Sequence, residues 1–339
     1  MKEMRKNLNY SALALLIVML TALPAQAASQ AEDLTHREDV RAFIERVSVA
    51  NKLDADKLRS VLAAARVQQS ILEAIARPAE KTMQWGRYRK IFLKPERIEG
   101  GLKFGAKYAA DLKRAEQRFG VPASIIIAII GVETRYGKHM GNYRVVDALA
   151  TLAFDYPPRS KFFSSELEHF LVLSLGNQLD PLQAKGSYAG AMGYGQFMPS
   201  SYRAYAVDFD DDGLADIWNN PVDAIGSVAN YFARHGWKKN GDVILPAQRN
   251  GEALDAKQLN ASLKPSVKVK NLATAGLTSK QVVKSSTLVA PLKYVGDEGD
   301  EYWLGLHNFY VITRYNRSRL YAMAVYQLSQ AIAEQMQES

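Results

Sequence analysis

The sequence predicts a mainly helical (α+β) protein whose helices are interrupted once by a small β-rich segment. Apolar residues recur at helical spacing over residues 30–82, and the same pattern returns in several later segments up to residue 336. Between residues 241 and 299 the pattern changes to short β-branched runs separated by Pro, Gly, Asn and Ser, which is typical of a small sheet. With 47% hydrophobic and 23% charged residues, the composition is that of a globular protein.

The helical segments are expected to follow one another in a definite order. The first stretch ends at Pro78, because proline cannot continue a helix. Residues 85–102 are aromatic and basic, and Gly100 and Gly101 predict a break there. Further helices are expected at 106–119, 121–137, 162–175, 224–235, 302–310 and 319–336. Strands are expected at 243–245, 267–269 and 287–289.

Residues 1–27 have the pattern of a secretory signal peptide. Three basic side chains within residues 2–6 precede an apolar run at 12–23, and residues 25–27 place small side chains at the cleavage positions. The alternative is an uncleaved membrane anchor, but the apolar run is shorter than the ~20 residues that a spanning helix needs. We therefore expect cleavage after Ala27 and a soluble protein in the periplasm.

The cysteine count and the net charge narrow the classes of protein further. The chain contains 0 cysteines, so an exported form has no disulfides and no cysteine to carry a lipid anchor. A formal net charge of +8 suits an anionic polymer such as the cell wall, or a membrane surface, although solubility alone is the simpler explanation. Nucleic acid is not expected as a partner, since the chain carries an export signal and no nucleic-acid-binding motif.

Glu133 lies near the end of the most apolar of the predicted helices. Pro122 opens that helix, residues 125–130 are apolar on every face, and Gly137 is expected to close it. At helical spacing Glu133 shares a face with the isoleucines of this run. A carboxyl group packed against apolar side chains has a raised pKa and can donate a proton near neutral pH, as the general acid of a glycosidase does. The structural alternative is a glutamate at the edge of the core, paired with a cation such as Arg135.

Residues 186–200, with the sequence GSYAGAMGYGQFMPS, form a glycine-rich loop. Its four glycines lie among small residues, and glycine lets one stretch of backbone approach another, or a ligand, closely. Ser187, Tyr194 and Gln196 would then offer polar groups along a groove. A loop used only for packing is the alternative, and spacing alone does not decide between the two.

Three motifs together resemble the lytic murein transglycosylase B family. They are GVETRYG at 131–137, the glycine-rich loop at 186–200, and NFYVITRYN at 308–316. Each motif is moderately specific, whereas the three in this order and at these separations are highly specific. The resemblance covers residues 35–335.

The resemblance implies a lysozyme-like core, a helical domain packed on it and a small β domain inserted into it. On that basis the chain divides into four parts. They are a signal peptide at 1–27, a helical domain at 30–102, a lysozyme-like catalytic core at 103–240 and 302–339, and a β-rich insertion at 241–301.

The resemblance also implies a reaction. Enzymes of this family cut the β-1,4 bond between N-acetylmuramic acid and N-acetylglucosamine in peptidoglycan and leave a 1,6-anhydro ring, so the reaction is a lyase-type transfer. Glu133 would protonate the glycosidic oxygen, and its carboxylate would then take the proton of the C6 hydroxyl that attacks C1. With no second carboxylate expected as nucleophile, the N-acetyl oxygen of the substrate would stabilise C1. No cofactor is expected for catalysis.

Two other functions remain open at this point. A hydrolytic muramidase would use the same groove and admit water, so that only its product would differ. A non-catalytic scaffold that binds peptidoglycan would keep the groove without the acid, and the presence of Glu133 argues against it. The expected partners are peptidoglycan glycan strands and cell-wall synthesis proteins, and the chain is expected to be a monomer.

The resemblance assigns eight further residues to the sugar-binding groove. Ser187 matches a serine that forms a hydrogen bond near the catalytic carboxyl, and Tyr315 with Asn316 matches a pair that lines the site. The substrate-binding set is Ser187, Gln196, Tyr315, Asn316, Tyr321, Tyr231, Arg159 and Tyr88. Tyrosine faces suit the C–H groups of sugar rings, with packing in the core as the alternative for each tyrosine.

Residues 208–219 begin like the calcium loop of an EF-hand. Asp208, Asp210 and Asp212 occupy positions 1, 3 and 5, and Gly213 occupies position 6. Asn219 stands where an EF-hand has a bidentate glutamate, so other oxygens would have to complete the shell. The ligands expected for a structural Ca²⁺ are Asp208, Asp210, Asp212, the Leu214 carbonyl, Asp216 and Asp223. The resemblance supports calcium here, and an acidic surface turn that caps the next helix is the alternative.

Overall fold

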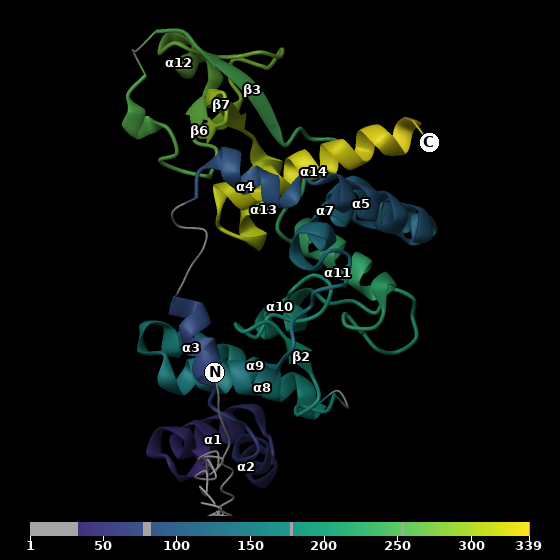
Figure 1. The fold of residues 1–339 in the computed structure, drawn as a ribbon, viewed down its shortest axis with the longest axis vertical. Helices are drawn as coiled ribbons and strands as arrows, with labels where there is room; N and C mark the ends of the chain where they lie inside the picture. Colours follow the sequence, from purple (N-terminus) through teal and green to yellow (C-terminus); the bar gives the residue numbers. More distant parts are fainter. Residues whose placement is uncertain (1–32, 77–82, 177–178, 252–253, 339) are drawn as a thin grey trace, which may run out of the picture. The chain divides into compact units, whose positions relative to one another are not determined.

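A computed structural model describes residues 33–76, 83–176, 179–251 and 254–338, and the predicted signal peptide lies outside these ranges. The described chain is mainly helical with a small sheet, which confirms the predicted class (Figure 1). The helices are α1 Glu38–Asn51, α2 Ala55–Ala63, α3 Gln69–Ala76, α4 Trp85–Phe92, α5 Pro95–Lys107, α6 Ala109–Phe119, α7 Ala123–Thr134, α8 Val145–Asp155, α9 Ser160–Gly176, α10 Pro199–Tyr205, α11 Pro221–Arg234, α12 Val269–Thr274, α13 His307–Tyr315 and α14 Arg319–Glu338. The strands are β1 Tyr143–Arg144, β2 Lys185–Gly186, β3 Ile244–Arg249, β4 Val267–Lys268, β5 Leu277–Ser279, β6 Leu288–Gly296 and β7 Gly299–Gly305.

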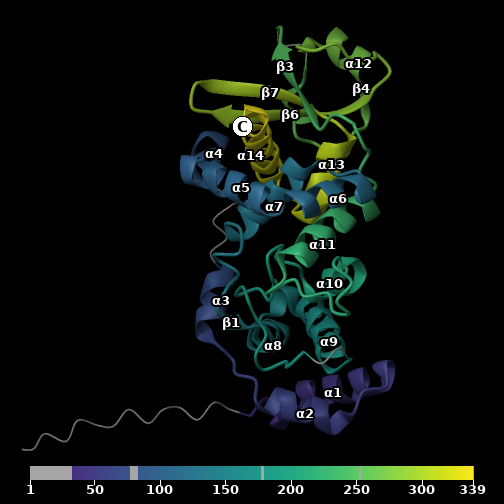
Figure 2. The ribbon, with the colours of Figure 1, turned by 90° about the vertical axis from the view of Figure 1, so that its right-hand side faces the viewer.

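Helices α1, α2 and α3 share a hydrophobic core with α8 and α9, and these helices lie near one another in the ribbon (Figure 2). Phe43 and Leu58 from the first helices join Leu149 and Leu167 in one buried cluster. In the chain, α8 and α9 lie between Glu133 and the glycine-rich loop. The first helices therefore support the segment that connects these two motifs.

Helix α7 is buried on all sides, as its apolar sequence predicts. It packs against α5, α6, α11 and α14. It ends at Thr134, short of the predicted end at Gly137, because Arg135, Tyr136 and Gly137 all take left-handed backbone angles with φ of 50°, 62° and 87°. Across the described ranges no single helix has the length and apolar character to cross a membrane, and α6 with α7 meets that test only as a pair bent by 113°.

The predicted break at Gly100 and Gly101 is wrong, because α5 runs through both residues. A Cβ atom on Gly100 would lie 2.7 Å from the Tyr136 ring, and one on Gly101 would lie 2.6 Å from Ile332 Cδ1. The two glycines therefore let α5 approach α7 and α14 closely. Their role is in helix packing, which local sequence patterns do not reveal.

The β-rich segment forms an antiparallel sheet with the strand order β4-β6-β7-β3-β5. Helix α12 packs against β4 and β5 and lies beside the sheet in both views (Figures 1 and 2). The expected helix at 302–310 is wrong in its first half. Tyr302 and Trp303 belong to β7, where they pair with Ala247 and Pro246 of β3. The same two residues also pair with β6 in a hairpin, and α13 begins only at His307.

Candidate active site

Glu133 is the second-last residue of α7 and is held by a tyrosine from α14. The Tyr321 hydroxyl donates a hydrogen bond to Glu133 Oε1 at 2.6 Å. Tyr321 is 3% exposed, whereas Glu133 is half-buried. Because α14 packs along α7, the two helices fix the position of the carboxyl group and leave part of it accessible.

Two buried tyrosines, Tyr315 and Tyr321, lie near this carboxyl group. Tyr315, the last residue of α13, donates from its hydroxyl to the Gly195 carbonyl at 2.5 Å. Burial and, next, the charge of Glu133 raise the pKa of Tyr315 and of Tyr321 well above the usual value of a tyrosine. Tyr88 of α4 is close enough to Tyr321 to add to this rise in pKa. Both hydroxyls therefore stay protonated at neutral pH and act as hydrogen-bond donors.

Thr134 connects α7 to the glycine-rich loop. Its hydroxyl donates to the Tyr194 carbonyl at 2.9 Å and accepts the N–H of Gly137 at 3.0 Å. Thr134 is fully buried. Sequence analysis missed this residue, although it stands directly beside Glu133 in the GVETRYG motif. Its position directly after Glu133 was the available signal in the sequence, since its burial is known only from the structure.

Ser187 and Gln196 hold the glycine-rich loop in shape. Ser187 Oγ accepts the backbone N–H groups of Ala189 and Ala191 at 3.3 and 3.1 Å. Gln196 has a left-handed φ of 50°, and its Nε2 donates to the carbonyls of Met140 and Gly193 at 3.1 and 3.0 Å. The loop is thus fixed by its own side chains, and contacts of these two residues with substrate stay a prediction.

The remaining predicted groove residues differ in how they relate to Glu133. Tyr231 is 7% exposed, and its ring centre lies 4.7 Å from that of Tyr315. Its hydroxyl donates to the Arg314 carbonyl, so Tyr231 supports Tyr315 from inside the core. Asn316 Oδ1 accepts the N–H of Ser318 at 3.0 Å and shapes the turn into α14. Arg159 is exposed, with its guanidinium 4.2 Å from the centre of the Phe162 ring. None of the contacts described for Arg159 reaches Glu133 or the glycine-rich loop.

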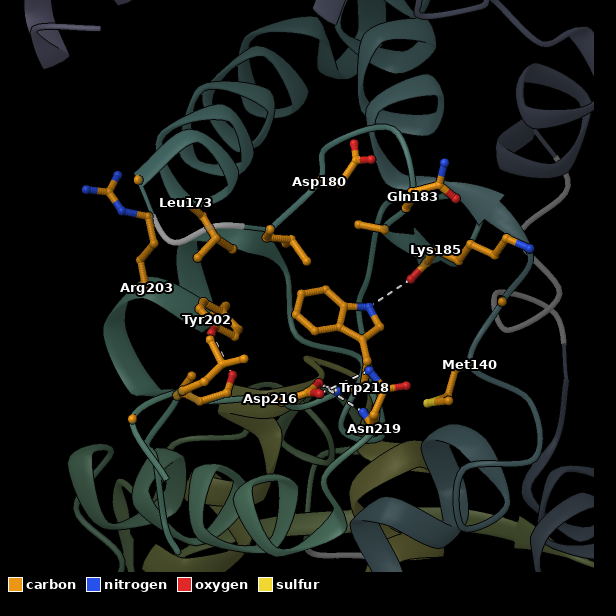
Figure 3. A pocket seen from close by; sticks show the side chains of 18 residues that line it. Met140, Leu173, Asp180, Gln183, Lys185, Tyr202, Arg203, Asp216, Trp218 and Asn219 are labelled. Atoms are coloured by element: carbon orange, nitrogen blue, oxygen red, sulfur yellow. Dashed lines mark hydrogen bonds between the residues drawn. The ribbon is translucent and has the colours of Figure 1, made fainter. Parts of the chain in front are cut away.

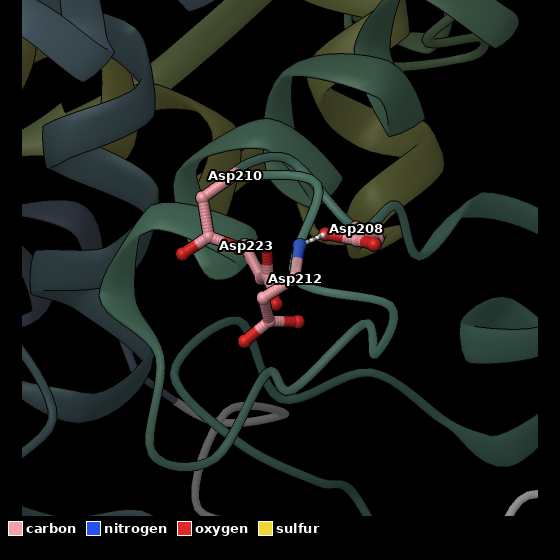
Figure 4. A group of neighbouring side chains, drawn as sticks. All are labelled: Asp208, Asp210, Asp212 and Asp223. Carbon is pink, nitrogen blue, oxygen red and sulfur yellow. Dashed lines mark hydrogen bonds between the residues drawn. The ribbon is translucent and has the colours of Figure 1, made fainter.

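Three carboxylates of the acidic loop, residues 208–219, lie together with a fourth from α11 (Figure 4). Asp208, Asp210, Asp212 and Asp223 each place one oxygen within 4.8 Å of the others. Asp223 is fully buried on α11, and burial raises the pKa of its carboxyl group, with Asp210 and Asp208 adding to the rise. Hard oxygen donors gathered in this way suit Ca²⁺, because a cation would offset their repulsion.

Asp216 lies outside this group of four. Its Oδ1 accepts the backbone N–H groups of Trp218 and Asn219, both at 2.9 Å. Asp216 is tied to the group through its backbone, since Asp223 Oδ2 accepts the N–H of Asp216 at 2.8 Å. The Leu214 carbonyl accepts the N–H of Asp216 at 3.0 Å. Of the expected ligands, four aspartates therefore fit a cation site together.

The acidic loop is also joined to the glycine-rich loop. Tyr194 N–H donates to the Ile217 carbonyl at 3.0 Å, and Trp218 Nε1 donates to the Lys185 carbonyl at 2.9 Å. A pocket of about 1200 Å³ opens beside this junction, and the Trp218 indole stands in it (Figure 3). Glu133 does not line this pocket. The pocket therefore adjoins the groove loop without containing the candidate acid.

The chain belongs to the transglycosylase SLT family, because residues 35–330 match the transglycosylase SLT domain. It is 46% identical over 310 residues to the membrane-bound lytic murein transglycosylase B of Escherichia coli K12, across 89% of this chain and 84% of that protein. The membership confirms the predicted enzyme class, a lytic transglycosylase.

Solved structures of lytic transglycosylases have the same fold. Soluble SltB1 from Pseudomonas aeruginosa superposes with a TM-score of 0.84 at 49% identity, over 88% of this chain and 99% of that chain. Escherichia coli Slt35 in complex with calcium superposes with a TM-score of 0.82 at 45% identity, over 89% of this chain and 95% of that chain. SltB3 from Pseudomonas aeruginosa in complex with NAG-NAM-pentapeptide superposes with a TM-score of 0.77 at 31% identity, over 87% of this chain and 78% of that chain. These matches confirm the predicted lysozyme-like fold with its β-rich part.

Proposed function

We propose that this lytic transglycosylase cleaves the β-1,4 bond between N-acetylmuramic acid and N-acetylglucosamine in peptidoglycan, with Glu133 as acid and then base. The main support is the hydrogen bond from Tyr321 to Glu133. The neighbouring Tyr315 is bonded to the glycine-rich loop at Gly195. The relatives support the substrate class. One is named for murein, and SltB3 was solved with both NAG-NAM-pentapeptide and NAG-anhNAM-pentapeptide.

In the first step the protonated Glu133 gives its proton to the glycosidic oxygen, and the bond from that oxygen to C1 of N-acetylmuramic acid breaks. The N-acetyl oxygen of the same sugar stabilises C1, as in substrate-assisted glycosidases. In the second step the Glu133 carboxylate takes the proton of the C6 hydroxyl while O6 bonds to C1. No water is consumed, and Glu133 is protonated again at the end.

The Tyr321 hydroxyl gives Glu133 one orientation through both steps. The hydrogen bond donated to Oε1 orients the carboxyl group while it gives up the proton and takes it back. Tyr315 holds the Gly195 carbonyl, so the loop that faces the substrate keeps its place relative to Glu133. Ser187, Gln196, Asn316, Tyr231, Tyr88 and Arg159 complete the proposed groove.

We propose further that the acidic loop binds a structural Ca²⁺. Asp208, Asp210, Asp212 and Asp223 would supply carboxylate oxygens, and the Leu214 carbonyl would add a fifth. Slt35, which is 45% identical, was solved with calcium, which supports this choice of ion. The bound ion would neutralise part of the loop's charge and supply no catalytic chemistry.

We infer that the mature chain is periplasmic. The predicted signal peptide supports export, and the 0 cysteines leave no thiol for a lipid, although the Escherichia coli relative is named membrane-bound. Partners among cell-wall synthesis proteins and the monomeric state also stay predictions.

Mass spectrometry of the products from purified peptidoglycan tests the reaction, with the mature chain and its Glu133→Gln variant compared side by side. We expect muropeptides one water lighter than hydrolysis products from the parent, and none from the variant. Reducing-end products would instead identify a muramidase. Intact wall binding without products from either protein would favour a non-catalytic scaffold.

A further inference from the structure

The β-rich insertion contains a long stretch without any acidic residue. Residues 257–293, the lysine-rich segment, hold seven lysines and no aspartate or glutamate. Lys293 pairs with Asp300 at 2.5 Å, whereas the other lysines of the segment are exposed. These exposed lysines make no ion pair within the described ranges. The lysine-rich segment therefore concentrates positive charge on one part of the insertion, which attracts anions.

Part of this charge surrounds a pocket of about 650 Å³ where the insertion meets the start of α13. Lys264 and Lys284 line it from the insertion, and Lys238 lines it from the segment after α11. Asp242 is the one acidic residue in its described lining. We call this site the lysine pocket.

The lysine pocket also has apolar walls. Leu288 is 48% exposed, and Val282 is fully exposed. Tyr310 of α13 lines the same pocket. Cations beside exposed aliphatic and aromatic side chains suit a ligand with both carboxylates and hydrocarbon groups. A short peptide has both, whereas a flat membrane surface does not fit a concave site.

The pocket is separate from the candidate active site but is connected to it by one helix. Helix α13 begins beside the pocket at His307 and ends at Tyr315, which holds the glycine-rich loop. Nine helical residues rise about 13 Å, and an extended pentapeptide spans up to about 17 Å. A peptide carried by a glycan bound near Tyr315 has a length comparable to this distance.

We propose that the lysine pocket binds free carboxylates of the peptides attached to the peptidoglycan strand, as a second contact outside the catalytic groove. This proposal rests on the proposed function, since it takes peptidoglycan as the substrate. Lys264, Lys284 and Lys238 pair with the carboxylates, and Val282 and Leu288 contact the aliphatic side chains. Holding the peptide this way raises the affinity for wall material that still carries its peptides.

The test measures co-sedimentation with purified peptidoglycan in a Glu133→Gln background, which prevents cleavage. Lys264→Glu with Lys284→Glu should raise the dissociation constant for peptide-bearing wall about tenfold at low salt, with a smaller difference at high salt. The matched control is Lys57→Glu with Lys113→Glu, the same charge change at exposed lysines of α2 and α6. The control should change the dissociation constant less than about twofold.

Three results would overturn the proposal. An equal loss of affinity for peptide-bearing wall in both pairs of substitutions would show an effect of net charge only. An equal loss of affinity for glycan strands stripped of peptides would assign the pocket to sugar. Loss of binding to phosphatidylglycerol vesicles, with binding to peptide-bearing wall unchanged, would assign it to an anionic membrane.

Cleavage of peptide-free glycan by the two pairs of lysine variants, with Glu133 restored, is measured separately. If no 1,6-anhydro products form there even from the parent, the proposed reaction fails independently of the binding result.

Discussion

The two carboxylate sites of this protein are held in opposite ways. Glu133 is held by Tyr321, which lies 188 residues further along the chain. Asp208 is held by the backbone N–H groups of Asp212 and Gly213, four and five residues away. A loop that fixes its own carboxylates can form from local spacing, whereas the position of Glu133 depends on the packing of α7 against α14. Damage far from Glu133 should therefore reach catalysis, and damage to the acidic loop should first appear in stability.

The largest expected effect comes from Tyr321→Phe, which removes the distant support of Glu133. We expect kcat to fall about 10²-fold, because one preorganised donor at a reacting group is lost. The free energy of unfolding should change by only about 1 kcal/mol, the net contribution of one hydrogen bond. Steady-state kinetics and urea unfolding measure the two quantities. Tyr326→Phe, at a half-buried tyrosine of the same helix α14, is the control. An unchanged kcat in Tyr321→Phe would remove this contact from the mechanism.

Gly193→Ala tests the junction between the two loops. Gly193 has a φ of +67°, and a Cβ there would lie 2.4 Å from the Ile217 carbonyl oxygen. We expect a loss of about 2–3 kcal/mol in the free energy of unfolding, from backbone strain and the clash together. Gly251→Ala, with a φ of +82° and open space around it, should cost only about 1 kcal/mol. Equal losses in the two variants would mean that strain alone is responsible.

Calcium should stabilise the protein without being required for the chemistry. At a free concentration 100 times the dissociation constant, binding adds about 2.7 kcal/mol to the free energy of unfolding. Asp212→Asn should reduce this gain, because one of the four clustered carboxylates is lost. Asp211→Asn changes a neighbouring aspartate outside the cluster and should keep it. Thermal unfolding with calcium or with chelator gives the comparison, and equal responses of the two variants would contradict the assigned ligands.

The smallest expected effect concerns His235, which stacks on Tyr231 behind the groove at 4.1 Å. Burial lowers the pKa of His235 below 6.5, and the charge of Arg314 lowers it further. The unfolded chain then binds the proton more readily, so stability falls as the pH drops from about 6.5 through the lower folded-state pKa. His235→Gln should flatten the pH dependence of the free energy of unfolding between about pH 7 and 5. An unchanged slope would show that other groups dominate this range.

What the sequence could predict follows the same division between local and distant contacts. The spacing of Asp208, Asp210 and Asp212 predicted their proximity, because a short loop brings neighbouring residues together. Asp223 was one of the residues expected to complete the shell, and the structure places it with the cluster while Asp216 caps the following turn. The apolar run before Glu133 predicted a buried helix for the same local reason.

Distant contacts needed either a family resemblance or the structure itself. Nothing in the local pattern connects Tyr321 with Glu133, and only the resemblance placed both in one groove. The predicted break in α5 was wrong because Gly100 and Gly101 leave room for the side chains of Tyr136 and Ile332, which come from distant parts of the sequence. The predicted helix from Tyr302 was wrong because Tyr302 and Trp303 pair with β6 in a hairpin and with the more distant β3. The catalytic and binding roles of the groove residues stay predictions until the variants are measured.

The contact between Tyr321 and Glu133 also has a consequence for timing. A ribosome or a translocation channel releases this chain from its N-terminus, so α7 emerges long before α14. Contacts between residues so far apart in sequence form late in folding, since a long loop must close first. The contact between Tyr321 and Glu133 therefore forms only when α14, the last described helix, has docked. A lytic transglycosylase of this fold thus completes that contact only after nearly its entire chain has been delivered.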